Sequence, residues 1–289
     1  MSQSPVLEPV HCRLFCLLAR RANTGVIFRR GPSKWVQIIR WDTEQDTFMP
    51  GQWFHGRIYE KRCDLSPNGR LMIYFASKFN ETTIADKEYT YAWTAISRPP
   101  YLTALALWPK GDCWHGGGLF TTNKRVWLNH LPAQAIPHPK HRPRGIEVTD
   151  NPNAAGEDDP VYLARLERDG WIFEQPYKLK KEKYGFGTDQ PRVYRRSSPD
   201  ALRTLVMADF IEGHNRRSEF TLRHNGGTTS LSNAEWADWD QRGRLVFMRE
   251  GKLFAANVDA EGRLHEQELA SFDEARFELQ KAPDWANRW

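Results

Sequence analysis

Four aspartates are the first residues in this chain that could do chemistry. Asp64, Asp112, Asp238 and Asp240 lie near the ends of apolar runs. A glycosidase needs a general acid and a second carboxylate about 5 to 9 Å apart, so aspartates that meet in a channel would indicate a hydrolase. However, Asp64 and Asp238 occupy equivalent positions of a repeated motif, and repeated positions generally serve the scaffold. We therefore expect structural aspartates, with a hydrolase as the alternative.

A metal site is the second possibility, because thiolate and imidazole ligands suit zinc. The candidate ligands are Cys113, His115, His130, His138 and His141. Their spacings match no closed zinc pattern, and a proline-rich loop that contains histidines is commonly just exposed. The sequence therefore predicts neither a metal site nor a cofactor.

The stretch "WHGGGLF" (114–120) has the run of glycines that forms an oxyanion hole in some esterases. That function requires a Gly-x-Ser-x-Gly nucleophile motif later in the chain, and the sequence has none. The run is better explained as a strand or bulge that another backbone approaches closely.

The composition bounds the class of protein. The chain has 289 residues, 40% of them apolar, and its 12 tryptophans are spread along its length, so disorder is excluded and one large domain is expected. Four cysteines form no dense framework, and no signal peptide or membrane span is evident, which favours the cytoplasm. A net charge of +5 permits an anionic partner without requiring one.

The most informative stretch is "DLSPNGRLMIY", because it recurs. A shift of 174 residues places it over "DWDQRGRLVFM", so that Gly69 meets Gly243. Weaker copies give a series of turn positions at Gly25, Gly69, Gly111, Gly170, Ala201 and Gly243. The two strong copies are four periods of about 43 residues apart, which agrees with the 40 to 45 residues of a WD-type propeller blade.

The strands of two units can be followed along the chain. The last copy predicts four strands in the segments 235–240, 244–250, 252–259 and 264–271, separated by glycine-containing or short polar turns. Three further strands are predicted near the N-terminus, at 26–31, 34–42 and 47–54. Helical periodicity is found only in "SFDEARFELQKA" (271–282), which predicts a short helix.

The stretch "LSPNGRLMIYFA" resembles the repeat of the WD40-like, TolB-type β-propellers, whose hallmark is a Ser-Pro-Asp-Gly turn between the first two strands of a blade. The resemblance implies an all-β propeller of five or six four-stranded blades, closed by pairing of the terminal segments. The closing inner strand is either 277–287 or the N-terminal "CRLFCLLAR" (12–20), and the sequence leaves this choice open. The resemblance carries no activity.

Function is predicted from the loops. The segment 131–160, rich in proline, glycine and charge, reads as an insertion between blades within a single domain 1–289. We expect a non-catalytic scaffold that binds a protein or another ligand through this insertion and the loops near 184 and 214. A nucleic-acid partner is less favoured, and no membrane is expected. The predicted binding residues are His138, His141, Arg142, Arg144, Lys180, Lys181, Arg216 and Arg217.

Overall fold

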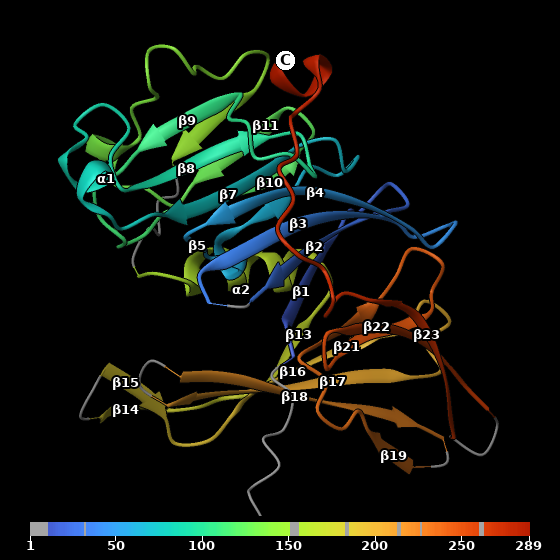
Figure 1. Cartoon of the computed structure of the whole chain (residues 1–289). Helices are drawn as coiled ribbons and strands as arrows, with labels where there is room; N and C mark the ends of the chain where they lie inside the picture. Colours follow the sequence, from blue (N-terminus) through green and yellow to red (C-terminus); the bar gives the residue numbers. More distant parts are fainter. Residues whose placement is uncertain are drawn as a thin grey trace, which may run out of the picture.

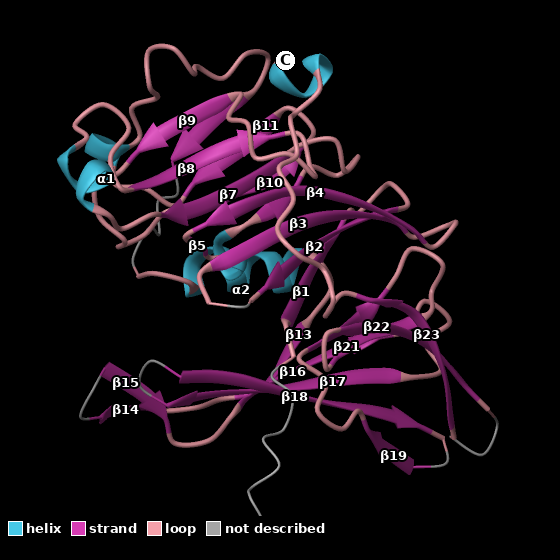
Figure 2. Ribbon diagram, in the orientation of Figure 1, coloured by secondary structure: helices cyan, strands magenta, loops and turns pink. Residues whose placement is uncertain are grey.

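The computed structural model describes residues 11–31, 33–150, 156–182, 185–212, 215–225, 227–259 and 263–289. Strands dominate, and the helical pieces are few and short (Figure 2). The main sheets form five blades that surround a common centre, so the protein is a five-bladed β-propeller (Figure 1). No helix in the described ranges is long and apolar enough to cross a membrane.

The blades follow one another along the chain. The first contains β1 (Arg13–Leu18), β2 (Thr24–Arg30), β3 (Trp35–Asp42) and β4 (Thr47–His55). The second contains β5 (Arg57–Ile58), β6 (Asp64–Leu65), β7 (Met72–Ser77), β8 (Ala92–Ser97) and β9 (Ala106–Pro109). The third contains β10 (Gly118–Thr122), β11 (Arg125–Leu128) and β12 (Glu147–Asp150), of which β12 runs parallel to β11. Part of the segment 131–160 therefore belongs to a blade.

The fourth blade contains β13 (Ile172–Gln175), β16 (Arg192–Ser197), β17 (Thr204–Glu212), β18 (Asn215–His224) and β19 (Gly227–Ser230), and a separate hairpin pairs β14 (Leu179–Glu182) with β15 (Gly185–Thr188). The fifth contains β20 (Trp236–Trp239), β21 (Leu245–Arg249), β22 (Lys252–Val258) and β23 (Leu264–Ser271). The helices are α1 (Glu81–Ala85) and α2 (Asp159–Arg168), with 3-10 turns η1 (Glu60–Arg62), η2 (Pro132–Gln134) and η3 (Asp284–Asn287). The four predicted strands of the fifth blade and the three of the first are thus confirmed.

The turn of the quoted motif joins β6 to β7 and is closed by its own side chains. The Leu71 amide donates to Ser66 Oγ at 3.0 Å, and Ser66 Oγ lies 2.8 Å from Asn68 Oδ1. Gly69 takes a φ of 66°, in the left-handed region that glycine enters without strain. The sequence Ser-Pro-Asn-Gly is therefore a complete turn.

The same turn recurs in the fourth blade. Between β16 and β17 the Arg203 amide donates to Ser198 Oγ at 3.0 Å, and Ser198 Oγ donates to the Asp200 carboxylate. Ala201 takes a φ of 59°, as the repeat predicts for the residue at the glycine position. The repeat is thus real even where its glycine has been lost.

In the fifth blade Asp240 replaces the serine. Its carboxylate accepts from the Arg244 amide at 2.9 Å, and Gly243 has a φ of 76°. The other three predicted positions do not join the first two strands of a blade. Gly25 lies within β2, where a Cβ would come 2.9 Å from the Trp41 ring, and Gly111 and Gly170 follow β9 and α2. Close approach and helix termination select glycine as strongly as a hairpin does, so the residue type alone could not separate these cases.

Replacing Ala201 by glycine should stabilise the protein by about 1 kcal/mol, because a left-handed alanine is strained and glycine relieves that strain. The reverse change, Gly243→Ala, should cost about 1 kcal/mol at the equivalent turn. Urea unfolding of both variants measures the two effects. Changes of the same sign in the two would show that the turns are not equivalent.

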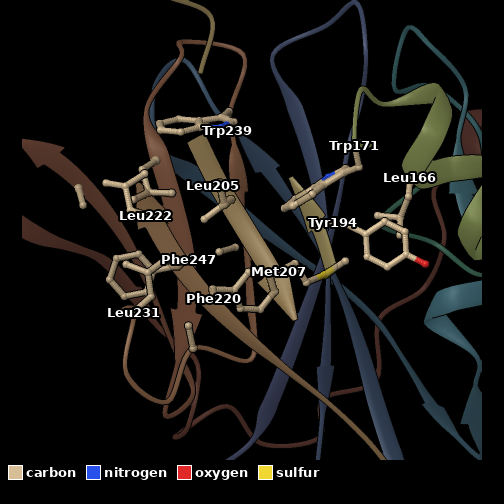
Figure 3. Packing of buried hydrophobic residues seen from close by; sticks show 14 of the residues in the cluster. Leu166, Trp171, Tyr194, Leu205, Met207, Phe220, Leu222, Leu231, Trp239 and Phe247 are labelled. Carbon is tan, nitrogen blue, oxygen red and sulfur yellow. The ribbon is translucent and has the colours of Figure 1, made fainter. Parts of the chain in front are cut away.

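Apolar clusters fill the spaces between most blades. One cluster joins α2, the fourth blade and the fifth, and its labelled members include Trp171, Leu205, Phe247 and Trp239 (Figure 3). Others join the fifth blade to the first, the first to the second, and the second to the third. Among the described residues no buried apolar cluster joins the third blade to the fourth.

Helix α2 occupies that remaining place. Asp159 and Pro160 begin it, as is usual for a first turn, and Tyr162 and Leu166 enter the cluster shared by the fourth and fifth blades. Arg165 and Arg168 lie on the part of the helix that reaches the second blade. The joint between the third and fourth blades is therefore a helix with one apolar face and one cationic face.

The helix predicted at 271–282 is wrong. After β23 the chain is extended, and its side chains cover the outer strands of the first blade, where Phe277 packs at 4.6 Å between ring centres from Trp35. The segment continues to the second blade, and the Arg98 side chain donates to the Arg288 carbonyl at 3.0 Å (Figure 1). The spacing of its aromatic residues therefore reflects packing of an extended segment against a sheet, and not the periodicity of a helix.

The N-terminal alternative supplies the inner strand of the first blade. β1 comes from "CRLFCLLAR" and pairs with β2 in register from Arg13 opposite Arg30 to Leu18 opposite Gly25. The two terminal segments meet beside it, where the Cys12 amide donates to the Asp273 carboxylate at 2.8 Å.

Candidate functional site

The centre of the ring holds a cavity of about 1130 Å³. All residues from Arg13 to Arg20 line it, so it follows β1 from end to end. Its other walls come mainly from α2, β18 and β20, and from the loop 231–235. Since β1 is a strand of the innermost layer, the cavity extends along the axis of the propeller. This is the site that the fold offers to a ligand.

Charged side chains dominate the cavity wall. Among the residues that the structure describes, nine basic residues line it: Arg13, Arg20, Arg30, Lys61, Arg165, Arg168, Arg196, Arg216 and Arg217. The seven acidic residues are Glu60, Asp64, Asp169, Glu219, Glu235, Asp238 and Asp240. The small excess of basic over acidic residues favours an anionic ligand only slightly. Which basic side chains can bind such a ligand therefore depends on which of them already pair with a carboxylate.

Asp64 is fully engaged in the wall. Its carboxylate receives both terminal nitrogens of Arg168, at 2.6 and 2.9 Å, and the Phe120 amide at 2.8 Å. Burial raises the pKa of Asp64, and the charge of Arg168 opposes that rise. The bidentate pair connects the second blade to α2, which is the structural role that the repeat predicts.

Asp238 is held in a similar way. It forms an ion pair with Arg196 of the fourth blade, and it accepts from the Trp239 amide at 2.8 Å. Burial raises the pKa of Asp238 as well, and the charge of Arg196 opposes the rise. The carboxylate therefore connects the fourth and fifth blades.

The two other candidate aspartates serve turns and loops. Asp240 closes the turn before β21 and pairs with Arg244 at 2.8 Å. Asp112 lies outside the cavity wall, where it pairs with Lys110 at 3.1 Å and accepts from Gln134. The four aspartates are therefore not gathered into one acid and base pair.

A buried network of ion pairs lies behind one end of the cavity. The Asp209 carboxylate, which is fully buried, pairs with Arg192 at 2.7 Å and lies 3.5 Å from Lys61 Nζ. Asp159 pairs with Arg192 at 3.1 Å and with Arg216 at 3.0 Å. Burial lowers the pKa of Lys61, and the charge of Asp209 opposes that change. Both carboxylates are thus occupied by cations.

Arg165 differs from the other arginines named so far. It is only 6% exposed, and its Nη1 donates to the backbone carbonyls of Glu60 and Cys63. Its guanidinium carbon lies 5.4 Å from the centre of the Phe15 ring. Within the described part of the chain it makes no ion pair with a carboxylate.

The predicted binding residues fall into separate places. Arg216 and Arg217 lie on β18 and line the cavity. His138 is 3% exposed and stacks on Tyr89, with 4.4 Å between ring centres, and it contacts Glu88 at 3.1 Å. The remaining predicted residues lie away from the cavity, either near His138 or on strand β14: His141, Arg142, Arg144, Lys180 and Lys181.

The candidate zinc ligands are equally dispersed. His130 is buried, with its ring nitrogens 2.7 Å from Thr94 Oγ1 and 2.9 Å from the Gln134 carbonyl. Burial lowers the pKa of His130 to about 4. Across the ranges that the structure covers, no three histidine, cysteine or acidic side chains gather as a metal site.

The glycine run also has structural partners. The Gly116 amide donates to the Asn129 carbonyl at 2.7 Å, and the Gly117 amide donates to Thr94 Oγ1 at 2.8 Å. A Cβ at Gly117 would lie 2.0 Å from the Arg62 carbonyl oxygen. The close backbone approach predicted for this stretch is confirmed, and its amides are not free to form an oxyanion hole.

Comparison with known proteins adds no family to this description. The sequence matches no protein-family model and no curated protein. The class of the protein is therefore defined by its fold and its cavity: a five-bladed β-propeller with a charged central site.

Proposed function

We propose that this protein is a non-catalytic β-propeller that binds its ligand in the central cavity. The observation that supports this function is the size of the cavity together with the state of its acids. A volume of about 1130 Å³ is sufficient for a small molecule or a short chain segment. Asp64 and Asp238 are each held by an arginine, so they shape the cavity and are poor proton donors or acceptors.

A carbohydrate hydrolase is the second candidate, and one observation favours it. Glu235 lines the same cavity, and the protein around it raises its pKa by desolvation. A carboxyl group with a raised pKa could act as a general acid. Its Oε2 accepts from the Leu14 amide at 3.0 Å. Hydrolysis of a glycoside panel by the unmodified protein, lost in Glu235→Gln, would favour this candidate over binding alone.

A tryptophan placed at the cavity wall tests the binding function. Ser232 is exposed and lines the cavity, so Ser232→Trp should obstruct the site with little effect on the core. We expect small molecules that copurify with the unmodified protein, detected by native mass spectrometry, to be lost from this variant. Ser271→Trp, at an exposed position of β23 outside the cavity, is the matched control and should retain them. Equal retention by both variants would contradict binding in the cavity.

A further inference from the structure

The free edge of the Arg165 guanidinium is the most specific feature of the cavity wall. Nη1 is used by the two backbone carbonyls, whereas Nε and Nη2 have no hydrogen-bond partner among the described residues. Neither of these two nitrogens is fully enclosed by protein atoms, and Arg165 lines the cavity. The Nε and Nη2 edge therefore reaches the cavity while the rest of the side chain is buried.

That edge has a definite chemical preference. Parallel N–H groups on Nε and Nη2 match the two oxygens of a carboxylate or a phosphate, and such bidentate contacts are among the strongest hydrogen bonds in proteins. Phe15 and Tyr162 place their rings 5.4 and 5.6 Å from the guanidinium carbon. These contacts and the two carbonyls fix the guanidinium before any ligand arrives, which lowers the entropic cost of binding.

Lys61 supplies a second positive charge against the same aromatic ring. Its Nζ lies 4.4 Å from the centre of the Tyr162 ring, the ring that Arg165 also contacts. Lys61 shares Asp209 with Arg192, and the Asp209 side chain is fully buried, so that carboxylate cannot reach the cavity. The side chain of Lys61 is 19% exposed and lines the cavity.

The acids nearest to this pair are already matched. The side chain of Glu60 pairs with Arg30, and Asp159 pairs with Arg192 and Arg216. Asp158 and Glu157 pair with Arg62. Asp64, whose charge also acts on Arg165, holds Arg168 through both of its oxygens. No carboxylate in the described part of the chain takes the free edge of Arg165.

We infer that the ligand carries a carboxylate or phosphate group, and that this group binds between the Nε and Nη2 edge of Arg165 and the ammonium of Lys61. The inference rests on the proposed function and adds the chemical class of the ligand to it. Arg165 determines the orientation of the anionic group, and Lys61 supplies charge.

Titration of the full chain with sodium phosphate and with sodium succinate, at constant ionic strength, tests the inference by calorimetry. The two anions distinguish a phosphate ligand from a carboxylate ligand. We expect at least one of them to bind, and we expect Arg165→Lys and Lys61→Gln each to weaken it about tenfold. Lys61→Gln leaves the backbone contacts of Arg165 intact, so it keeps the test valid where Arg165→Lys is unstable.

The control is Arg125→Gln, which removes a charge that pairs with Glu147 at 2.8 Å outside the cavity. Its affinity should stay within about twofold of the unmodified protein. If Lys61→Gln and Arg165→Lys both bind the anion as tightly as the unmodified protein does, the inference is overturned, as it is if neither anion binds. Ser232→Trp separates the two proposals: loss of copurifying ligand in that variant alone refutes the anion site and leaves the cavity as the binding site.

Discussion

Replacing Arg168 by methionine should lower the free energy of unfolding by about 3 to 5 kcal/mol, which is the usual cost of leaving one member of a buried ion pair alone. Asp64, 2% exposed, would lose both of its charge-assisted bonds and keep only the Phe120 amide. Urea unfolding measures the effect. A loss below about 1 kcal/mol would show that water or another cation reaches Asp64.

The double variant Asp64→Asn/Arg168→Met is the matched control. An asparagine oxygen can still accept from the Phe120 amide, and no buried charge remains without a partner. We therefore expect the double variant to recover most of the stability that the single variant loses. This outcome would show that the loss in the single variant comes from leaving Asp64 buried without a partner, and not from a large net contribution of the ion pair to stability.

The pH dependence of the single variant has a definite sign. Burial already raises the pKa of Asp64, and loss of Arg168 removes the charge that opposes the rise. A carboxyl group with a raised pKa in the folded state binds more protons there than in the unfolded chain, so stability falls as the pH rises above about 4. The deficit of Arg168→Met should therefore be smallest at acidic pH and grow toward neutral pH.

Among the glycines of the second and third blades, Gly117 should be the one whose replacement by alanine is most damaging. Gly117 has a φ of 80°, and the new Cβ would lie 2.0 Å from the Arg62 carbonyl oxygen, which is backbone and cannot rotate away. We expect a loss of at least about 3 kcal/mol, from left-handed strain and overpacking together. Thermal and urea unfolding check this result.

Gly145→Ala separates the two causes. Gly145 has a φ of 66°, and no heavy atom lies within 4 Å of its added Cβ. Its substitution should cost only about 1 kcal/mol, the part due to backbone conformation. Similar losses at the two positions would refute the steric argument.

The parts of the fold that the sequence predicts are those with local causes. Ser66 with Gly69, and Asp240 with Gly243, each form a turn through bonds among a few neighbouring residues, so the turns are recognisable from the chain alone. The strands of the fifth blade follow because short turns separate apolar runs. The inner strand of the first blade depends on which terminal segment packs better against distant blades, and the sequence contains no local sign of that.

The candidate site was less predictable. Arg216 and Arg217 are predicted as binding residues from a basic cluster in the sequence, and both line the cavity, although they lie on a strand and not in a loop. Arg165 and Lys61 lie outside the basic clusters that the sequence singles out among its 41 lysines and arginines, and only the tertiary contacts of Arg165 leave one of its edges unpaired. The Asp-Pro pair and the apolar residues that follow it in α2 could have signalled the helix, but they adjoin a loop-like segment rich in proline.

The unequal chemistry of the joints between the blades decides the order in which the propeller should come apart. Four spaces are filled with apolar side chains, whose burial sulfate-type salts strengthen, whereas α2 meets the second blade through the buried Arg168–Asp64 pair, which such salts do not strengthen and, because it is buried, screen only weakly. Added sulfate thus stabilises four of the contacts and leaves the fifth nearly unchanged. On unfolding in sulfate, the blades should therefore separate first at α2, beside the ligand cavity. The contact between the first and fifth blades, where the two terminal segments meet, should be lost later.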